Sequence, residues 1–117
     1  MNSYRELFVW QKSMSLVTEL YNVTNSFPSS ELYGLTSQIR RSAVSIPANI
    51  AEGYGRQATQ DYIRFLKIAR GSLFELQTLL EISTNLGYIN NDYFQKQFDA
   101  SIEIEKMLTT LIKKLQK

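Results

Sequence analysis

The sequence predicts an all-α protein: an up-down-up-down antiparallel four-helix bundle, folded as a single domain over residues 1–117. Three observations lead to this prediction. Apolar residues recur at alternating steps of three and four in four stretches, which is the spacing of amphipathic helices. No stretch shows the strict alternation of a strand. The stretches are joined by connections of about three to six residues, which suit antiparallel neighbours.

The first helix is predicted over about residues 7–26, because apolar side chains there fall on one helical face. Phe27 and Pro28 end it, since proline cannot continue a helix and restricts the residue before it. The predicted core stripe consists of Leu7, Trp10, Met14, Val17, Tyr21 and Thr24.

The second helix is predicted over about residues 30–55, with Ser29 or Ser30 as its cap and Glu31 in its first turn. Pro47 lies inside it and cannot donate to the carbonyl four residues earlier, so the helix should bend or restart there. Its predicted core stripe consists of Leu32, Leu35, Ile39, Ala43, Ile46, Ile50 and Tyr54.

The third helix is predicted over about residues 60–86, with Thr59 as its N-cap, Asp61 in its first turn and Gly87 as its C-terminal stop. Its core stripe is predicted to contain Tyr62, Phe65, Leu66, Ala69, Leu73, Leu76 and Leu80.

The fourth helix is predicted over about residues 91–116, and Asn90 or Asn91 caps its N-terminus. Its core stripe is predicted to contain Phe94, Phe98, Ser101, Leu108, Ile112 and Leu115.

The second helix has a further face built almost wholly of small side chains, here called the small-residue face. It comprises Ser37, Val44, Ala48, Ala51 and Gly55. Small side chains let another helix approach closely, and a monomeric bundle needs only one buried stripe per helix. The face therefore predicts self-association, and apolar residues off the core stripe of the third helix agree with it. The alternative is that the alanines only favour helix formation and that scattered apolar residues are exposed.

A narrow polar line on the second helix includes Asn49, Glu52 and Arg56. Two interpretations stay open. If the line is buried against another chain, Asn49 and Glu52 belong to the oligomer interface, and Arg56 or an arginine of that chain must pair with Glu52. If it faces solvent, Glu52 and Arg56 form a weak surface pair.

Positive charge is concentrated in the middle of the chain. Residues 40–70 contain six basic side chains and two acidic ones, although the whole chain has a net charge of only +2. The six are Arg40, Arg41, Arg56, Arg64, Lys67 and Arg70. They predict a surface that binds RNA or DNA through its backbone and shape. The alternatives are a solvated helix face, or an oligomeric scaffold whose basic residues pair with acids of adjoining subunits.

The composition argues against catalysis. The chain has no histidine and no cysteine, which removes the imidazole base, the thiolate nucleophile and the usual zinc ligands. We therefore predict no catalytic residue, no metal site and no cofactor. An enzyme dependent on carboxylates would need a deep pocket around Glu52. The charged start MNSYRELFVW and the lack of cysteine predict a cytoplasmic protein, and the lack of a long apolar run argues against a membrane partner.

Three segments are similar to one known family. VWQKSMSLV, SQIRRSAVSIPANIAEGYGR and DYIRFLKIARGSLFELQTLLEIS resemble the small bacterial four-helix bundle proteins encoded by the intervening sequence of 23S ribosomal RNA genes. The resemblance extends from about Leu7 into the last helix. It implies assembly into a ring-like homopentamer. The family is also similar to the accessory variability proteins of diversity-generating retroelements, which implies nucleic acid, and an enzyme acting on nucleic acid, as candidate partners.

Overall fold

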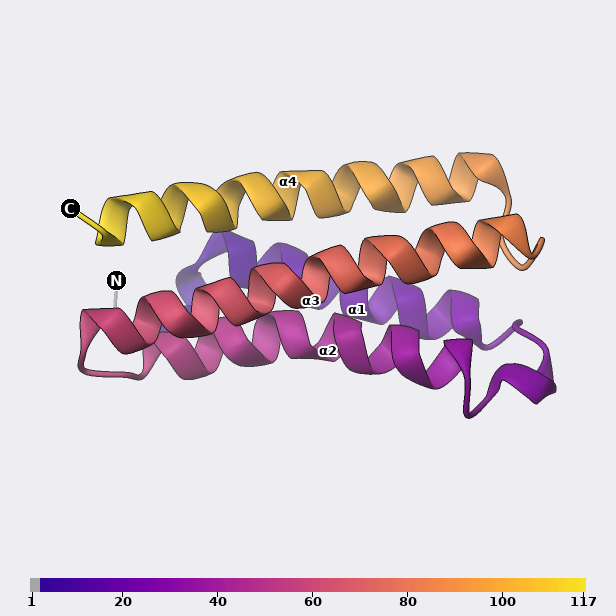
Figure 1. Ribbon diagram of the computed structural model, residues 1–117, viewed down its shortest axis with the longest axis horizontal. Helices are drawn as coiled ribbons and strands as arrows, with labels where there is room; N and C mark the ends of the chain where they lie inside the picture. Colours follow the sequence, from indigo (N-terminus) through magenta and orange to yellow (C-terminus); the bar gives the residue numbers. More distant parts are fainter. Residues whose placement is uncertain (1–2) are drawn as a thin grey trace.

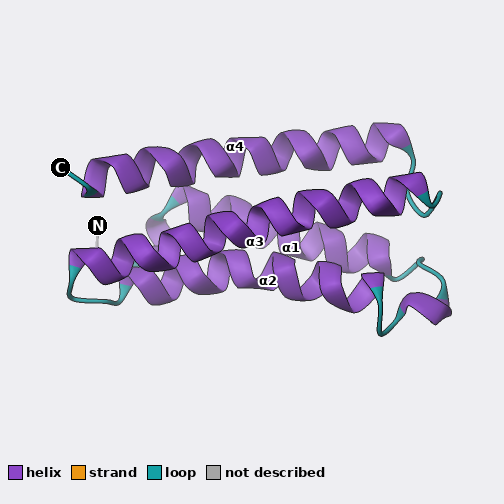
Figure 2. Cartoon of the chain, viewed as in Figure 1, coloured by secondary structure: helices purple, strands orange, loops and turns teal. Residues whose placement is uncertain are grey.

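The computed structural model describes residues 3–117 and contains, over that range, four long α-helices and no strand (Figure 2). The helices are α1 (Phe8–Thr24), α2 (Leu35–Tyr54), α3 (Thr59–Asn85) and α4 (Asn91–Leu115). Two short 3₁₀ turns, Tyr4–Glu6 and Ser29–Glu31, precede α1 and α2. The prediction of an all-α protein with four helices is thus confirmed.

The helices lie side by side along the long axis of a body measuring 44 × 24 × 20 Å (Figure 1). The contact between α2 and α3 is the most extensive, and that between α1 and α4 is the sparsest of those joining two helices. Helix α1 begins and α4 ends at the same end of the body (Figure 1). Within residues 3–117, none of the helices combines the length and the apolarity that crossing a bilayer requires.

The core-facing side of α1 differs from the predicted stripe. The buried residues are Val9, Ser13, Leu16, Leu20 and Thr24. By contrast, Met14 and Tyr21 are each 41% exposed. Two hydroxyl residues can be buried here because Ser13 Oγ donates to the Val9 carbonyl at 2.6 Å and Thr24 Oγ1 to that of Leu20 at 2.7 Å.

Helix α2 starts at Leu35 and not near residue 30. The backbone of Gly34 (φ −110°, ψ −114°) is not helical, and it separates the 3₁₀ turn from the helix. The cap also differs from the predicted serines: Glu31 Oε1 accepts a hydrogen bond from Leu35 N at 3.2 Å. Leu32 therefore lies outside the helix and is 48% exposed. Helix α2 continues through the buried Pro47, which excludes a restart at that residue.

The residues that begin and end α3 and α4 agree in part with the predicted caps. Thr59 is the first residue of α3, and Ala58 occupies the cap position without a side-chain hydrogen bond. Gly87 ends the segment with φ +80°, a conformation that favours glycine. Asn90 caps α4 through its side-chain oxygen, which accepts from Tyr93 N at 2.7 Å.

Candidate functional site

The small-residue face lies on the outer side of α2. Val44, Ala48 and Gly55 are exposed, while Ser37 and Ala51 are half-buried. The opposite side of the same helix holds Ile39, Ala43, Ile46 and Ile50 in the core. In the isolated chain, nothing from α1, α3 or α4 covers the small-residue face completely.

Aromatic and aliphatic side chains extend this face toward α1. Tyr21 of α1, Leu32, Tyr33 and Val44 line a surface groove of about 530 Å³ together with Ser37. Tyr33 is 91% exposed and Val44 40%. Tyr21 and Leu32 were predicted to lie in the core. They belong instead to this outer apolar surface, and a helical wheel centred on Val9, Leu16 and Leu20 predicts that position for Tyr21.

The polar line faces the contact between α2 and α3. The Asn49 amide donates to the Ser45 carbonyl at 2.7 Å and to Ser45 Oγ at 2.9 Å, and Ser45 Oγ shares a 2.8 Å hydrogen bond with Ser72 Oγ of α3. Asn49 is therefore half-buried with partners in its own chain. The carboxylate of Glu52 pairs with Arg56 at 2.8 Å, and both side chains are about half exposed. A pair this exposed is worth little on its own.

The predicted basic residues divide into groups with different surroundings. Arg41 and Lys67 are exposed and have no hydrogen-bond, ion-pair or ring partner among residues 3–117. Arg40 is held by α1: it donates to Thr24 Oγ1 at 2.9 Å and to Asn25 Oδ1 at 3.0 Å. Arg41 also lines the groove that contains Val44, and Lys67 lines a surface groove with Ile68, so both cations lie beside apolar side chains.

Arg56 and Arg64 lie over the same aromatic ring. Their guanidinium carbons are 4.8 and 4.6 Å from the centre of Phe65, a distance suited to cation–π attraction. Arg64 also lies 4.0 Å from Asp61. Both guanidinium groups are thus fixed near the start of α3 while remaining about half exposed.

Arg70 points to the other side of α3. It donates to Thr109 Oγ1 of α4 at 3.2 Å, and Thr109 in turn donates to Glu105 at 2.8 Å. The structure thus brings Arg56 and Arg64 together, and it places Arg40 and Arg70 on different helix contacts.

The described chain shows no arrangement of three or more histidine, cysteine, aspartate or glutamate side chains that could hold a metal ion. Burial, and secondly the charge of Tyr54, raises the pKa of Tyr62, which packs against α2.

Comparison with known proteins gives one family and one solved structure. Residues 5–110 match the model of the family described as 23S rRNA-intervening sequence protein. A crystal structure from Bacteroides thetaiotaomicron VPI-5482, described as a protein with unknown function from the S23 ribosomal protein family, is similar, with a TM-score of 0.81 and 30% sequence identity. The alignment covers 90% of this chain and 98% of that one. No curated protein matches.

Proposed function

The chain belongs to the 23S rRNA-intervening sequence protein family, and we propose that it is a self-assembling helical bundle without enzyme activity. We propose further that its basic surface contacts RNA or DNA without base specificity. The ring-like homopentamer is the assembly that the family resemblance implies. An up-down arrangement of the helices suits such a ring, because it leaves whole helix faces open to neighbouring copies.

The observation on which the assembly rests is the exposed small-residue face with its aromatic border. An outer surface that combines Val44 and Ala48 with Tyr21 and Tyr33 is typical of an interface between chains. Helix α3 also has exposed apolar side chains, namely Ile68, Phe74 and Ile82, which are 40–48% exposed. Exposed apolar residues on two different helices suit a head-to-tail contact, and a head-to-tail contact gives a ring when the rotation between neighbouring copies closes.

Nucleic-acid binding is supported by the basic residues that remain available. Within the chain Arg41 and Lys67 are exposed and unpaired, and each borders a proposed contact surface: Arg41 lines the groove that contains Val44, and Lys67 lines one with Ile68. Arg56 and Arg64 are held in place by Phe65. A ring repeats these groups in every subunit, so several phosphates could be neutralised at once. The enzyme acting on nucleic acid that the resemblance suggests would then be recruited by the same ring.

The test is binding of a structured RNA to the intact protein across a salt series, with the double variant Arg41→Ala, Lys67→Ala. We expect weaker binding and a shallower dependence of affinity on salt. The double variant Lys96→Ala, Lys113→Ala is the matched control, because both are exposed lysines of α4 outside the basic segment. Undetectable affinity at low salt, or an equal effect of both variants, would remove nucleic-acid binding.

A scaffold without a nucleic-acid role is the second candidate. The pairs Glu52–Arg56 and Asp61–Arg64 favour it, since they neutralise two of the arginines within the chain. A scaffold predicts that the Arg41→Ala, Lys67→Ala variant still assembles and that RNA neither binds nor competes with its protein partners.

A further inference from the structure

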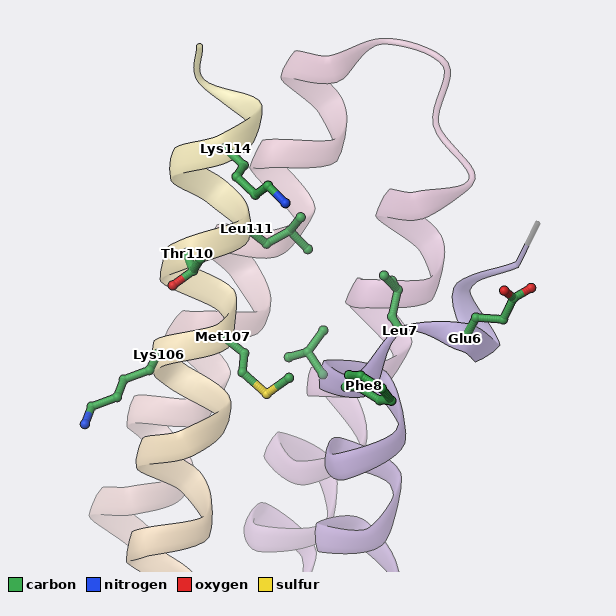
Figure 3. Close-up of a pocket in the computed structure, with 9 residues that line it drawn as sticks. Glu6, Leu7, Phe8, Lys106, Met107, Thr110, Leu111 and Lys114 are labelled. Carbon is green, nitrogen blue, oxygen red and sulfur yellow. The ribbon is translucent and has the colours of Figure 1, made fainter. Parts of the chain in front are cut away.

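A groove lies between the start of α1 and the last turns of α4 (Figure 3), and none of its lining residues belongs to α2. Its volume is about 480 Å³, which falls within the roughly 300–1,000 Å³ of small-molecule sites. The apolar side chains that line it are Leu7, Phe8, Val9, Met107 and Leu111. Phe8 is 70% exposed although it is a large aromatic residue. The groove forms where the contact between two helices is sparsest.

The charges around this groove are mostly positive. Lys106 and Lys114 lie on its α4 side, and neither forms an ion pair within residues 3–117. In Figure 3 the Lys114 side chain points toward the groove and ends beside Leu111, whereas the carboxylate of Glu6 points away from the groove. Lys113 and Lys117 follow in the same C-terminal segment, which has no acidic residue after Glu105.

The start of α1 adds to this positive potential. Leu7 is the N-cap of α1, and its side chain makes no capping hydrogen bond. The first turn of α1 contains no acidic residue. The first turn of α1 therefore contributes no carboxylate that would offset the positive end of the helix dipole, and the acidic side chain before it in the chain is that of Glu6. An apolar trough with an unpaired ammonium group beside it complements a ligand that has an apolar chain and an anionic head.

We propose that the groove binds a free, single-chain carboxylate amphiphile such as a medium-chain fatty acid. The carboxylate is placed at the Lys114 ammonium, and the alkyl chain lies against Met107 and Phe8. Size argues against a partner helix: a helix with its side chains is about 10–12 Å wide, so one turn alone occupies roughly 500 Å³. Helices recognised in grooves use anchors spread over about two turns.

The test is titration calorimetry of the intact protein with dodecanoate below its micelle concentration, with dodecanol and anionic phospholipid vesicles as parallel arms. We expect saturable binding of dodecanoate, about fivefold tighter than that of dodecanol. Lys114→Gln should abolish this preference. Lys113→Gln, which removes a neighbouring lysine that does not line the groove, should retain it.

Met107→Glu should prevent binding of both dodecanoate and dodecanol, since it places a carboxylate among the apolar lining side chains. If that variant fails to fold, as judged by circular dichroism, Lys114→Gln still decides the matter. The proposal is overturned by absence of dodecanoate binding, by binding to vesicles alone, or by equal effects of the Lys113 and Lys114 variants. A groove covered by a second copy or by a partner helix would give the first of these results. Self-association and RNA binding are measured separately, so their failure leaves this site unaffected.

Discussion

The guanidinium carbon of Arg40 in α2 lies 4.6 Å from the centre of the Tyr21 ring in α1. This contact places an aromatic ring of α1 directly beside the small-residue face of α2, and it joins the two helices into one outer surface. It also removes Arg40 from the set of freely available cations. Arg40 thus stabilises the contact between α1 and α2, whereas Arg41, the next residue in the chain, is exposed.

Arg40→Ala should lower the free energy of unfolding by about 1–2 kcal/mol, because the end of α1 loses charge-assisted hydrogen bonds to Thr24, Asn25 and the Tyr21 carbonyl. Chemical denaturation measures this change in the free energy of unfolding. Arg41→Ala is the control and should change stability by less than about 0.5 kcal/mol. Equal stability losses in the two variants would contradict this division of roles.

Ala48→Glu should disrupt assembly while leaving the helical content intact, because it introduces an unpaired carboxylate into the proposed contact between chains. Gln38→Glu adds the same charge to an exposed position of α2 outside the small-residue face and serves as the control. Size-exclusion chromatography compares the assembly of the two variants, and circular dichroism compares their helical content. An Ala48→Glu protein that elutes with the wild type would place the interface elsewhere.

Two glycines inside helices should respond oppositely to alanine. A Cβ atom on Gly53 would lie 2.7 Å from Phe65 Cβ and 3.1 Å from Tyr62 Cδ1, so Gly53→Ala should destabilise the protein by about 1–3 kcal/mol. Gly71 has no atom within 4 Å of such a position, and Gly71→Ala should stabilise it by about 0.5–1 kcal/mol. Thermal denaturation at matched protein concentration checks both. Stabilisation by Gly53→Ala would show that α2 and α3 are not this close.

The opposite responses expected at Gly53 and Gly71 depend on distances between helices, which the sequence alone does not give. The four helices could be predicted, since periodic apolar residues and the signals at Pro28, Gly87 and Asn90 are local. The core side of α1 could not be read from hydrophobicity, because Ser13 and Thr24 are buried through bonds to their own backbone. The start of α2 depends on a Glu31 carboxylate and on the backbone of Gly34, where residue types alone favoured a serine cap.

The candidate site was predictable in part for the same reason. The small-residue face follows from helical periodicity, and Val44, Ala48 and Gly55 are exposed as that periodicity requires. The concentration of arginines in residues 40–70 did not indicate which of them contact other side chains of the chain. Which arginines are occupied depends on side chains distant in sequence, such as Tyr21 for Arg40 and Thr109 for Arg70.

Stability should fall in strongly alkaline solution through Tyr93. Burial, and secondly the hydrogen bond that its hydroxyl donates to Glu19 at 3.0 Å, raise the pKa of Tyr93 above its usual value of about 10. The folded state then holds a proton that the unfolded chain releases, so this stabilisation is fully present below about pH 10 and declines as the pH rises further.

Tyr93→Phe should be less stable at pH 7 by about 0.5–1.5 kcal/mol, because the hydrogen bond is lost, and its stability should fall less steeply above about pH 10. Urea denaturation at several pH values measures both effects. Tyr33→Phe is the control, since the Tyr33 side chain is 91% exposed. A wild-type decline equal to that of Tyr93→Phe would rule out this group as the cause.

Multi-angle light scattering on the wild-type protein at micromolar concentration tests self-association most directly. We expect a uniform species of about five times the 13.5 kDa chain mass, with the small-residue face of α2 covered by the next copy. A species of 13.5 kDa would contradict it, because Val44, Ala48 and Tyr33 would then face solvent in the working form of the protein.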